Sequence, residues 1–314
     1  MKKENNKDVY FHTDKNSNHN NNNNLEIFQS ENVKNEKENQ FGVPLDSFID
    51  NNLSIKILKL VIENSATIQK GETIIITPKG LIGSKRKDKD KLNEVFFGYQ
   101  TNLENLKVDY LLPPNPLFQS NTKIESQQNL NNEGIYFKIT YNPTNNNYTI
   151  KDLEVGNGTF IKITDDYYLV ENSLVNIGDS YLVFTFIEDK DEPNEKNLLL
   201  KAYSGSIKYQ PITFKHKIKK DYIIGRGEKD DVVLQDKMLS RVHCMIHYDD
   251  EKGWFIRDGN ENGKGSTNGT WVFAFDEMEI IDGMLFKANS NLFSCHIQSG
   301  TEKFEFLFGN ILIF

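Results

Sequence analysis

The sequence predicts an all-β protein in which two similar sandwich domains follow an Asn-rich N-terminal tail. From Leu53 onward, short apolar runs rich in Ile, Leu, Phe and Tyr are separated by Gly, Asn, Asp and Lys, as in proteins built from strands and tight turns. No long segment of the sequence has the 3.6-residue apolar period of an amphipathic helix. Similar runs recur in the same order in both halves, which indicates a tandem internal repeat.

Length, charge and cysteine content limit the classes of function. The 314 residues suit about two domains. A net charge of -8 at pH 7 argues against a nucleic-acid partner held by phosphate neutralisation. No apolar run approaches the roughly 20 residues that span a membrane, so we expect a soluble protein without a membrane partner. Cys244 and Cys295 lie in strand-like runs and suggest no disulfide. We therefore expect an intracellular protein, with nucleus and cytoplasm undecided.

The first 52 residues are dominated by Asn, Lys and Glu and include an unbroken Asn run from Asn20 to Asn24. They lack the apolar periodicity that would offset the entropy of ordering the chain. We therefore predict a disordered tail over residues 1–52 and assign it no function.

A first sandwich is expected over residues 53–190 and a second over 198–300. Strands are predicted in the first at 55–62, 73–77, 135–141, 148–152, 159–163 and 181–187. Within residues 85–130, about 30 residues have no counterpart in the second half. We interpret this stretch as a loop insertion.

The charged run 188–196 interrupts the apolar pattern, so we place a linker over residues 191–197. Residues 301–314 form a strongly apolar C-terminal extension. We expect this extension to pair as a further strand with 293–297, to pack against the first domain, or to act as a docking motif.

The repeat is clearest where short stretches align. Residues 74–84 parallel 216–226, and each stretch contains an Ile-Gly pair just before its last residue. Residues 148–152 parallel 254–258, and an Asn-Gly-Thr follows each of them. The order and spacing of these stretches agree between the halves.

Three short motifs stand in order in the second half. An apolar run ends in Gly-Arg at 225–226, Ser-Arg-Val-His occupies 240–243, and Asn-Gly occupies 268–269. Together, over about residues 197–300, they resemble the forkhead-associated (FHA) domain. The resemblance implies an eleven-stranded β-sandwich whose loops at one end bind phosphothreonine peptides.

The resemblance implies a phosphopeptide site made of loop residues. A phosphothreonine carries about -1.5 to -2 charge and three acceptor oxygens, so its binding site needs fixed donors and a cation. By resemblance, Arg226 and Ser240 contact the phosphate, and the planar guanidinium of Arg226 can donate two parallel hydrogen bonds. Arg241 is expected to supply a second cationic or backbone donor, Thr267 a donor from the opposite loop, and Asn268 a contact to the peptide backbone.

Three further residues are expected to support this site without touching the ligand. The resemblance implies that His243 is buried and braces its loop from behind. Gly269 should permit a tight turn, because glycine takes positive φ at little cost. Gly225 ends the strand that precedes the site arginine.

Three other patterns favour turns or core packing over chemistry. Residues 263–267 differ from a phosphate-binding P-loop in spacing and precede no predicted helix. Ser240 and His243 point apart on one short segment, and no third group orients them for nucleophilic catalysis. Cys244 faces away from His243 and His247 on a strand, so a zinc site is not expected. We therefore predict no catalytic residue, no metal, no cofactor and no enzymatic activity.

The first half keeps the strand pattern without the site residues. Its Gly83 is followed by serine rather than arginine. One alignment replaces the serine and histidine of the motif by Glu133 and Tyr136, and an alternative one keeps a serine, Ser126, but no histidine. We expect a degenerate FHA-like domain that serves as a structural partner or as a phosphate-independent contact surface.

The sequence thus predicts a phosphothreonine-peptide-binding protein that acts as a phosphorylation-dependent signalling adaptor. We expect micromolar affinity, because ordering a flexible peptide offsets much of the gain from a few charge-assisted hydrogen bonds. The alternative is a structural assembly protein that uses both sandwiches as phosphate-independent docking surfaces. Replacing Arg226 abolishes binding in the first case and leaves it intact in the second.

Overall fold

The computed structural model describes residues 55–87, 93–114, 134–188 and 196–299. Every regular element in these ranges is a β-strand, so the predicted all-β fold is confirmed. Among the described residues, no helix is long and apolar enough to cross a membrane. The predicted tail over 1–52, most of the predicted linker and the C-terminal extension over 301–314 lie outside the described residues.

The strands of the first half follow the apolar runs of the sequence, with alternating buried and exposed side chains where one face meets a core. They are β1 (Lys56–Asn64), β2 (Thr73–Thr77), β3 (Gly80–Leu81), β4 (Glu94–Tyr99), β5 (Tyr110–Leu111), β6 (Gly134–Asn142), β7 (Asn147–Asp152), β8 (Thr159–Lys162), β9 (Tyr167–Tyr168), β10 (Ser173–Ile177) and β11 (Ser180–Glu188).

The second half repeats this succession. Its strands are β12 (Lys196–Ser204), β13 (Ile207–Lys208), β14 (Ile212–Phe214), β15 (Asp221–Gly225), β16 (Val232–Val233), β17 (Cys244–Asp249), β18 (Gly253–Asp258), β19 (Thr270–Phe273), β20 (Met278–Glu279), β21 (Leu285–Ala288) and β22 (Asn291–Ser299).

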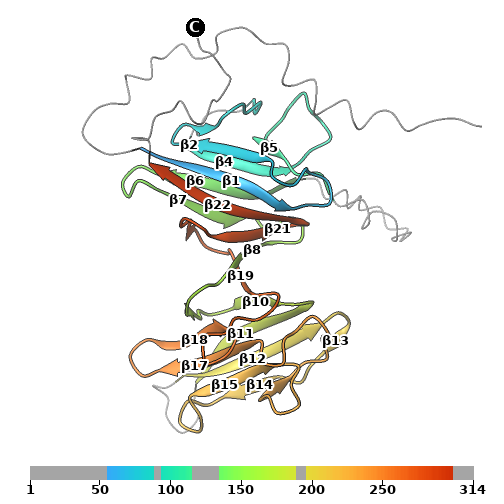
Figure 1. Ribbon diagram of the computed structural model, residues 1–314, viewed down its shortest axis with the longest axis vertical. Helices are drawn as coiled ribbons and strands as arrows, with labels where there is room; N and C mark the ends of the chain where they lie inside the picture. Colours follow the sequence, from blue (N-terminus) through green and yellow to red (C-terminus); the bar gives the residue numbers. More distant parts are fainter. Residues whose placement is uncertain (1–54, 88–92, 115–133, 189–195, 300–314) are drawn as a thin grey trace, which may run out of the picture. The chain divides into compact units, whose positions relative to one another are not determined.

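The strand pairing assembles two sandwiches, and each half of the sequence contributes to both. One, the first sandwich, combines β1–β8 with β20–β22: its sheets run β8-β21-β22-β1-β2-β3 and β20-β7-β6-β4-β5. The other, the second sandwich, consists of β9–β19: one face is formed by β13-β12-β11-β10-β19, with β14 also on β12, and the other by the sheet β16-β15-β17-β18-β9. The strand β19 also pairs with β8, so that β13-β12-β11-β10-β19 and β8-β21-β22-β1-β2-β3 form one continuous sheet that is shared by the two sandwiches. Figure 1 shows the red strand β22 beside the blue β1, and the yellow-green β10 and β11 next to β12.

The pairing differs from the expected division into residues 53–190 and 198–300, because the last three strands of the two repeats are exchanged. Leu60 of β1 pairs with Cys295 of β22. Tyr181 of β11 pairs with Tyr203 of β12. Strands of similar pattern can complete either sandwich, so local sequence does not decide between them. The second sandwich is consequently a continuous segment, 167–273, inserted between β8 and β20 of the first.

Four phenylalanine rings pack together in the core of the first sandwich. They come from both halves of the sequence, as expected if strands are exchanged between the repeats. Phe97 stacks on Phe137 with a centroid distance of 4.5 Å. Phe286 stacks on Phe293 at 4.6 Å. The two pairs meet edge to face, with Phe137 and Phe286 5.5 Å apart. All four are fully buried, and two come from each half of the sequence.

The stretch 85–130 is not simply the inserted loop that we expected. It contains β4 and β5, which pair in parallel as β15 and β16 do in the second sandwich. The short apolar run of β4 is embedded in charged and polar residues, which hid it in the sequence. Residues 115–133, which include much of the remaining stretch, lie outside the described residues.

The recurrence of this pairing also corrects the repeat alignment. Gly98 pairs with Leu111 in the same way that Gly225 pairs with Val233. Gly98 ends an apolar strand, and a Cβ on it would overlap the backbone oxygen of the strand's neighbour, as it would at Gly225. The counterpart of Gly225 is therefore Gly98 rather than Gly83.

Candidate functional site

The predicted site residues lie on three loops of the second sandwich. Arg226 directly follows β15, Ser240 and Arg241 lie between β16 and β17, and Thr267 and Asn268 lie between β18 and β19. These loops meet because β15 pairs with both β16 and β17, and β17 pairs with β18.

Arg226 is exposed, and the neighbouring loop fixes the base of its side chain. Its Nε donates to the carbonyl oxygen of Leu239 at 2.6 Å, and its backbone N–H donates to that of Ser240 at 3.2 Å. Among the described residues, no hydrogen bond joins its two terminal nitrogens to the protein. The side chain is thus anchored at Nε and presents the end of its guanidinium to a ligand.

Ser240 and Thr267 face each other across the two loops. The Thr267 backbone N–H donates to Ser240 Oγ at 3.0 Å, and Ser240 Oγ lies 3.2 Å from Thr267 Oγ1. Asn268 is held to the same loop, because its Nδ2 donates to the carbonyl of Met238 at 2.7 Å. Polar donors from two loops therefore converge beside the anchored arginine.

Arg241 follows Ser240 on the loop between β16 and β17. Its carbonyl accepts from the Gly227 N–H at 3.1 Å, and its side chain is exposed. Within the described chain, no hydrogen bond joins this side chain to the other site residues. The backbone of Arg241 matters more directly: a Cβ at Gly225 would overlap its carbonyl oxygen, which explains the glycine there.

His243 is fully buried and contacts two loops. Its Nδ1 accepts from the Ser240 N–H at 3.1 Å, so the ring proton of the neutral form lies on Nε2, which is 3.2 Å from the carbonyl of Gly269. Gly269 itself has φ +76°, a left-handed conformation that favours glycine. Burial lowers the pKa of His243 below its ordinary value.

Acidification is expected to destabilise the second sandwich through His243. Because the folded-state pKa lies below the unfolded value of about 6.5, the stability is complete above that value and falls as the pH drops towards the folded pKa, by at most about 1.4 kcal/mol per pH unit. Trp254 lies on β18 of this sandwich, so its fluorescence in a Trp271→Phe background reports urea unfolding of the sandwich. Trp271 is replaced because its strand, β19, also pairs with β8 of the first sandwich. A His243→Gln variant with the same pH dependence as the unaltered protein would contradict this assignment.

One residue that sequence reasoning missed, Asp258, holds the third loop. Asp258 accepts from the Ser266 backbone N–H at 2.9 Å and from Ser266 Oγ at 2.6 Å. It also accepts from Thr270 Oγ1 at 2.7 Å. An aspartate at the end of a predicted strand, followed by serine and threonine in the next loop, was the available signal for such a brace.

The matching end of the first sandwich has different side chains. With Gly98 opposite Gly225, Tyr99 occupies the position of Arg226. Phe97 pairs with Phe137 as Ile224 pairs with Cys244, so the buried Tyr136 occupies the position of His243, in agreement with one of the two alignments. Glu133 and Ser126, the candidates for the Ser240 position, lie outside the described residues.

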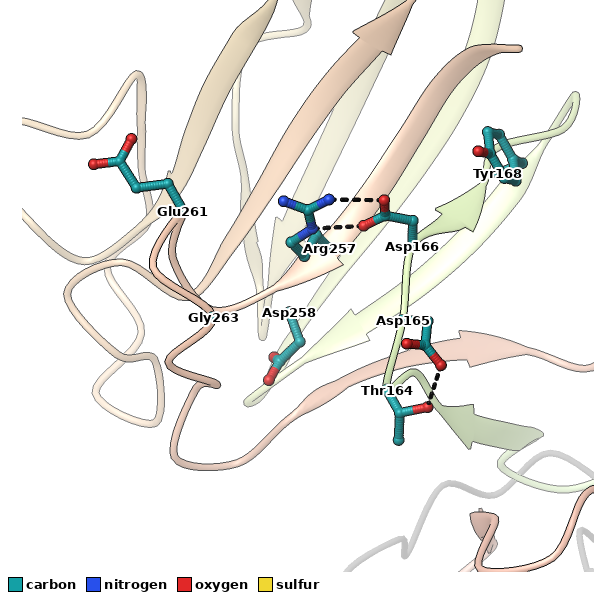
Figure 2. A pocket seen from close by; sticks show the side chains of 8 residues that line it. All are labelled: Thr164, Asp165, Asp166, Tyr168, Arg257, Asp258, Glu261 and Gly263. Carbon is teal, nitrogen blue, oxygen red and sulfur yellow. Dashed lines mark hydrogen bonds and ion pairs between the residues drawn. The ribbon is translucent and has the colours of Figure 1, made fainter.

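A pocket of about 480 Å³ is also lined in part by Asp258 (Figure 2). Its lining includes Asp165, Asp166 and Glu261. Arg257 donates to Asp166 from Nε at 2.5 Å and from Nη2 at 2.7 Å, which ties the β8–β9 connection to β18. The excess of carboxylates makes this pocket unsuitable for phosphate.

Residues 222–280 match the family model of the FHA domain, which confirms the predicted resemblance for this segment. The segment contains all five residues expected to contact a ligand. FHA domains are interaction modules rather than enzymes, and the match supports phosphothreonine-dependent interaction at the level of the family.

No curated protein matches the sequence. Among solved structures, the crystal structure of the Slr1951 protein from Synechocystis sp. is similar, with 16% identity over 40% of this chain and 95% of that chain and a TM-score of 0.19. A second, from a structural and functional analysis of phosphothreonine-dependent FHA domain interactions, has 18% identity, the same coverage of both chains and a TM-score of 0.16.

Proposed function

We propose that the second sandwich binds a phosphothreonine-containing segment of a partner protein and that the chain acts as a phosphorylation-dependent adaptor. The observation that carries the proposal is the convergence of Arg226, Ser240 and Thr267 from three loops, each held by hydrogen bonds to a neighbouring loop. A dianionic phosphate requires a fixed cation and fixed donors of this kind.

Each group has a separate task in the proposed complex. The guanidinium end of Arg226 donates to two phosphate oxygens, while Nε stays on Leu239. The hydroxyls of Ser240 and Thr267 rotate from each other towards the phosphate, because a hydroxyl can donate in more than one direction. Asn268 keeps its bond to Met238 and offers its amide oxygen to the peptide backbone. The protein then binds without converting its partner chemically.

The first sandwich is proposed to have no phosphate site and to serve as a structural partner. Tyr99 at the arginine position supplies no cation, and a neutral phenol cannot replace the bidentate charge-assisted contact. The protein is proposed to work inside the cell, in nucleus or cytoplasm, since both of its cysteines are buried free thiols.

The test uses the full chain and a degenerate phosphothreonine peptide library, with unphosphorylated and phosphoserine libraries beside it. Selected peptides should bind with micromolar affinity, and Arg226→Ala should weaken binding at least about 30-fold, because a charged hydrogen-bonded partner of the phosphate is lost. Arg226→Lys should recover little, since lysine cannot donate in a bidentate manner.

Arg257→Ala is the matched control, because it removes the same charge from the same sandwich at a residue paired with Asp166. It should leave the affinity close to that of the unaltered protein. Tryptophan fluorescence must show that every variant is folded. Equal binding of phosphorylated and unphosphorylated peptides, or equal binding by Arg226→Ala, would favour the phosphate-independent assembly protein instead.

A further inference from the structure

The turn between β10 and β11 lies directly against the loop that carries Ser240. Gly178 has φ +54°, and a Cβ on it would lie 2.9 Å from Asp236 Oδ2 and 2.9 Å from the Met238 side chain. The turn belongs to the first repeat of the sequence, whereas the loop belongs to the second. The strand exchange therefore brings a segment of one repeat to the candidate site of the other.

Asp236 joins this turn to the loop. The residue is buried, with an exposed fraction of 6%. Its Oδ2 accepts from Ser180 Oγ at 2.7 Å and from the Asp179 backbone N–H at 2.8 Å. Its Oδ1 accepts from the Met238 backbone N–H at 2.8 Å. One carboxylate thus binds the turn with one oxygen and the loop with the other.

The loop passes this constraint on to the site residues. The carbonyl of Met238 accepts from Asn268 Nδ2, and the carbonyl of Leu239 accepts from Arg226 Nε. Asp236 holds the N–H of Met238 with its carboxylate and the N–H of Leu239 with its own carbonyl, at 3.2 Å, and the carbonyls of these same two residues anchor the asparagine and the arginine. Three hydrogen bonds of 2.6 to 2.8 Å connect Ser180 to Asp236, Asp236 to Met238, and Leu239 to Arg226. The peptide bond between Met238 and Leu239 completes this path.

We propose that the β10–β11 turn, through Ser180 and Asp236, positions the phosphopeptide site of the second sandwich. This inference rests on the proposed function. Ser180 and Asp236 are positioning residues, because they hold the loop and have no direct contact with the ligand. The site is thereby completed by a segment that precedes the family match along the chain.

The first test is Ser180→Ala in the full chain, measured with a phosphothreonine peptide selected from the degenerate library. The variant leaves Asp236 Oδ2 with one donor fewer, so the peptide must order the loop when it binds, and we expect about tenfold weaker affinity. Ser173→Ala is the matched control. It removes two part-buried hydrogen bonds between Ser173 Oγ and the backbone of Val170, at the other end of β10, and should leave the affinity unchanged.

A double-mutant cycle distinguishes positioning from general loss of stability. Ser180→Ala should have little further effect on affinity in an Asp236→Ala background, because the effect passes through that carboxylate. Additive losses of affinity in the double variant would overturn the proposal, as would unchanged affinity in Ser180→Ala itself.

Amide hydrogen exchange provides a readout that needs no peptide. Exchange at Met238 and Leu239 should be faster in Ser180→Ala than in the unaltered protein and in Ser173→Ala. If no phosphothreonine peptide binds the unaltered chain, the proposed function fails, and exchange alone decides whether the turn holds the loop. Equal exchange in all three proteins would overturn the positioning role on its own.

Discussion

A chain cut once between β11 and β12 is expected to remain one particle under native conditions. The cut, at a protease recognition sequence placed within residues 189–195, yields one fragment with β1–β11 and another with β12–β22. Each fragment supplies three strands to the sandwich of the other. The fragments can separate only if those strands leave both cores, which requires unfolding.

The energetic reason lies in what the exchanged strands bury. β22 pairs with β1 over nearly its whole length and brings the buried Phe293 and Cys295 into the first sandwich. β11 pairs with β12 from Ser180 to Glu188 and brings Leu182 and Phe184 into the second. Removing several fully buried side chains costs about 1.5–3 kcal/mol for each, so spontaneous separation is negligible.

Gel filtration of the cut protein is the measurement. The fragments should elute together in buffer and apart in concentrated urea, and the urea run confirms that cleavage is complete. Separation in buffer would contradict the exchange and would favour contiguous sandwiches over 53–190 and 198–300. As a companion measurement, a fragment spanning 164–277 should fold and bind the peptide.

Phe286→Ala is expected to destabilise the first sandwich by about 3–5 kcal/mol and to affect the second much less, although Phe286 lies in the second repeat of the sequence. The smaller effect passes through β8, which pairs with both β21 and β19. Its ring stacks on Phe293 and meets Phe137 edge to face inside the first sandwich. The substitution opens a cavity among four aromatic rings, and these cannot close it without losing their contacts.

Phe184→Ala is the reciprocal variant, because Phe184 lies in the first repeat but is buried in the sheet of the second sandwich. Urea unfolding is followed by far-UV circular dichroism for the whole protein. In a Trp271→Phe background, the fluorescence of Trp254 follows the second sandwich, because Trp271 contacts Lys287 of the first. Phe286→Ala should shift mainly the transition that Trp254 does not report and should keep peptide affinity. A shift of the fluorescence transition by Phe286→Ala, with none by Phe184→Ala, would refute the strand assignment.

The sequence was sufficient for the fold class and for most strands, because alternation of buried and exposed residues is a local property. It was insufficient for the connectivity. The runs that became β9–β11 and β20–β22 have the same character in both repeats, and whether they fold back or cross over depends on packing between segments far apart in the chain. The repeat alignment failed for a related reason: Ile82-Gly83 and Phe97-Gly98 both resemble Ile224-Gly225, and strand pairing alone distinguishes them.

The candidate site was predictable where its residues belong to short sequence motifs that stand in a characteristic order along the chain. Arg226, Ser240 and Asn268 were expected together and lie together. The supports were less visible. Asp236 and Ser180 are 56 positions apart and bear no motif, so their contact emerges only when the exchanged turn is in place. Such contacts are set by tertiary packing and not by local pattern.

The pairing of β1 with β22 also sets the order in which a ribosome can complete the molecule. Leu60 cannot pair until Cys295 has been synthesised, 235 positions later in the chain. The second sandwich has all its strands once Phe273 has left the ribosome. The first sandwich, whose synthesis begins earlier, still lacks β20, β21 and β22 at that time. At about 5–20 residues per second, the early strands therefore spend ten seconds or more with an open edge and an incomplete core. During that time the nascent chain is exposed to edge-to-edge association, and the half of the protein that is translated first is the last to become stable.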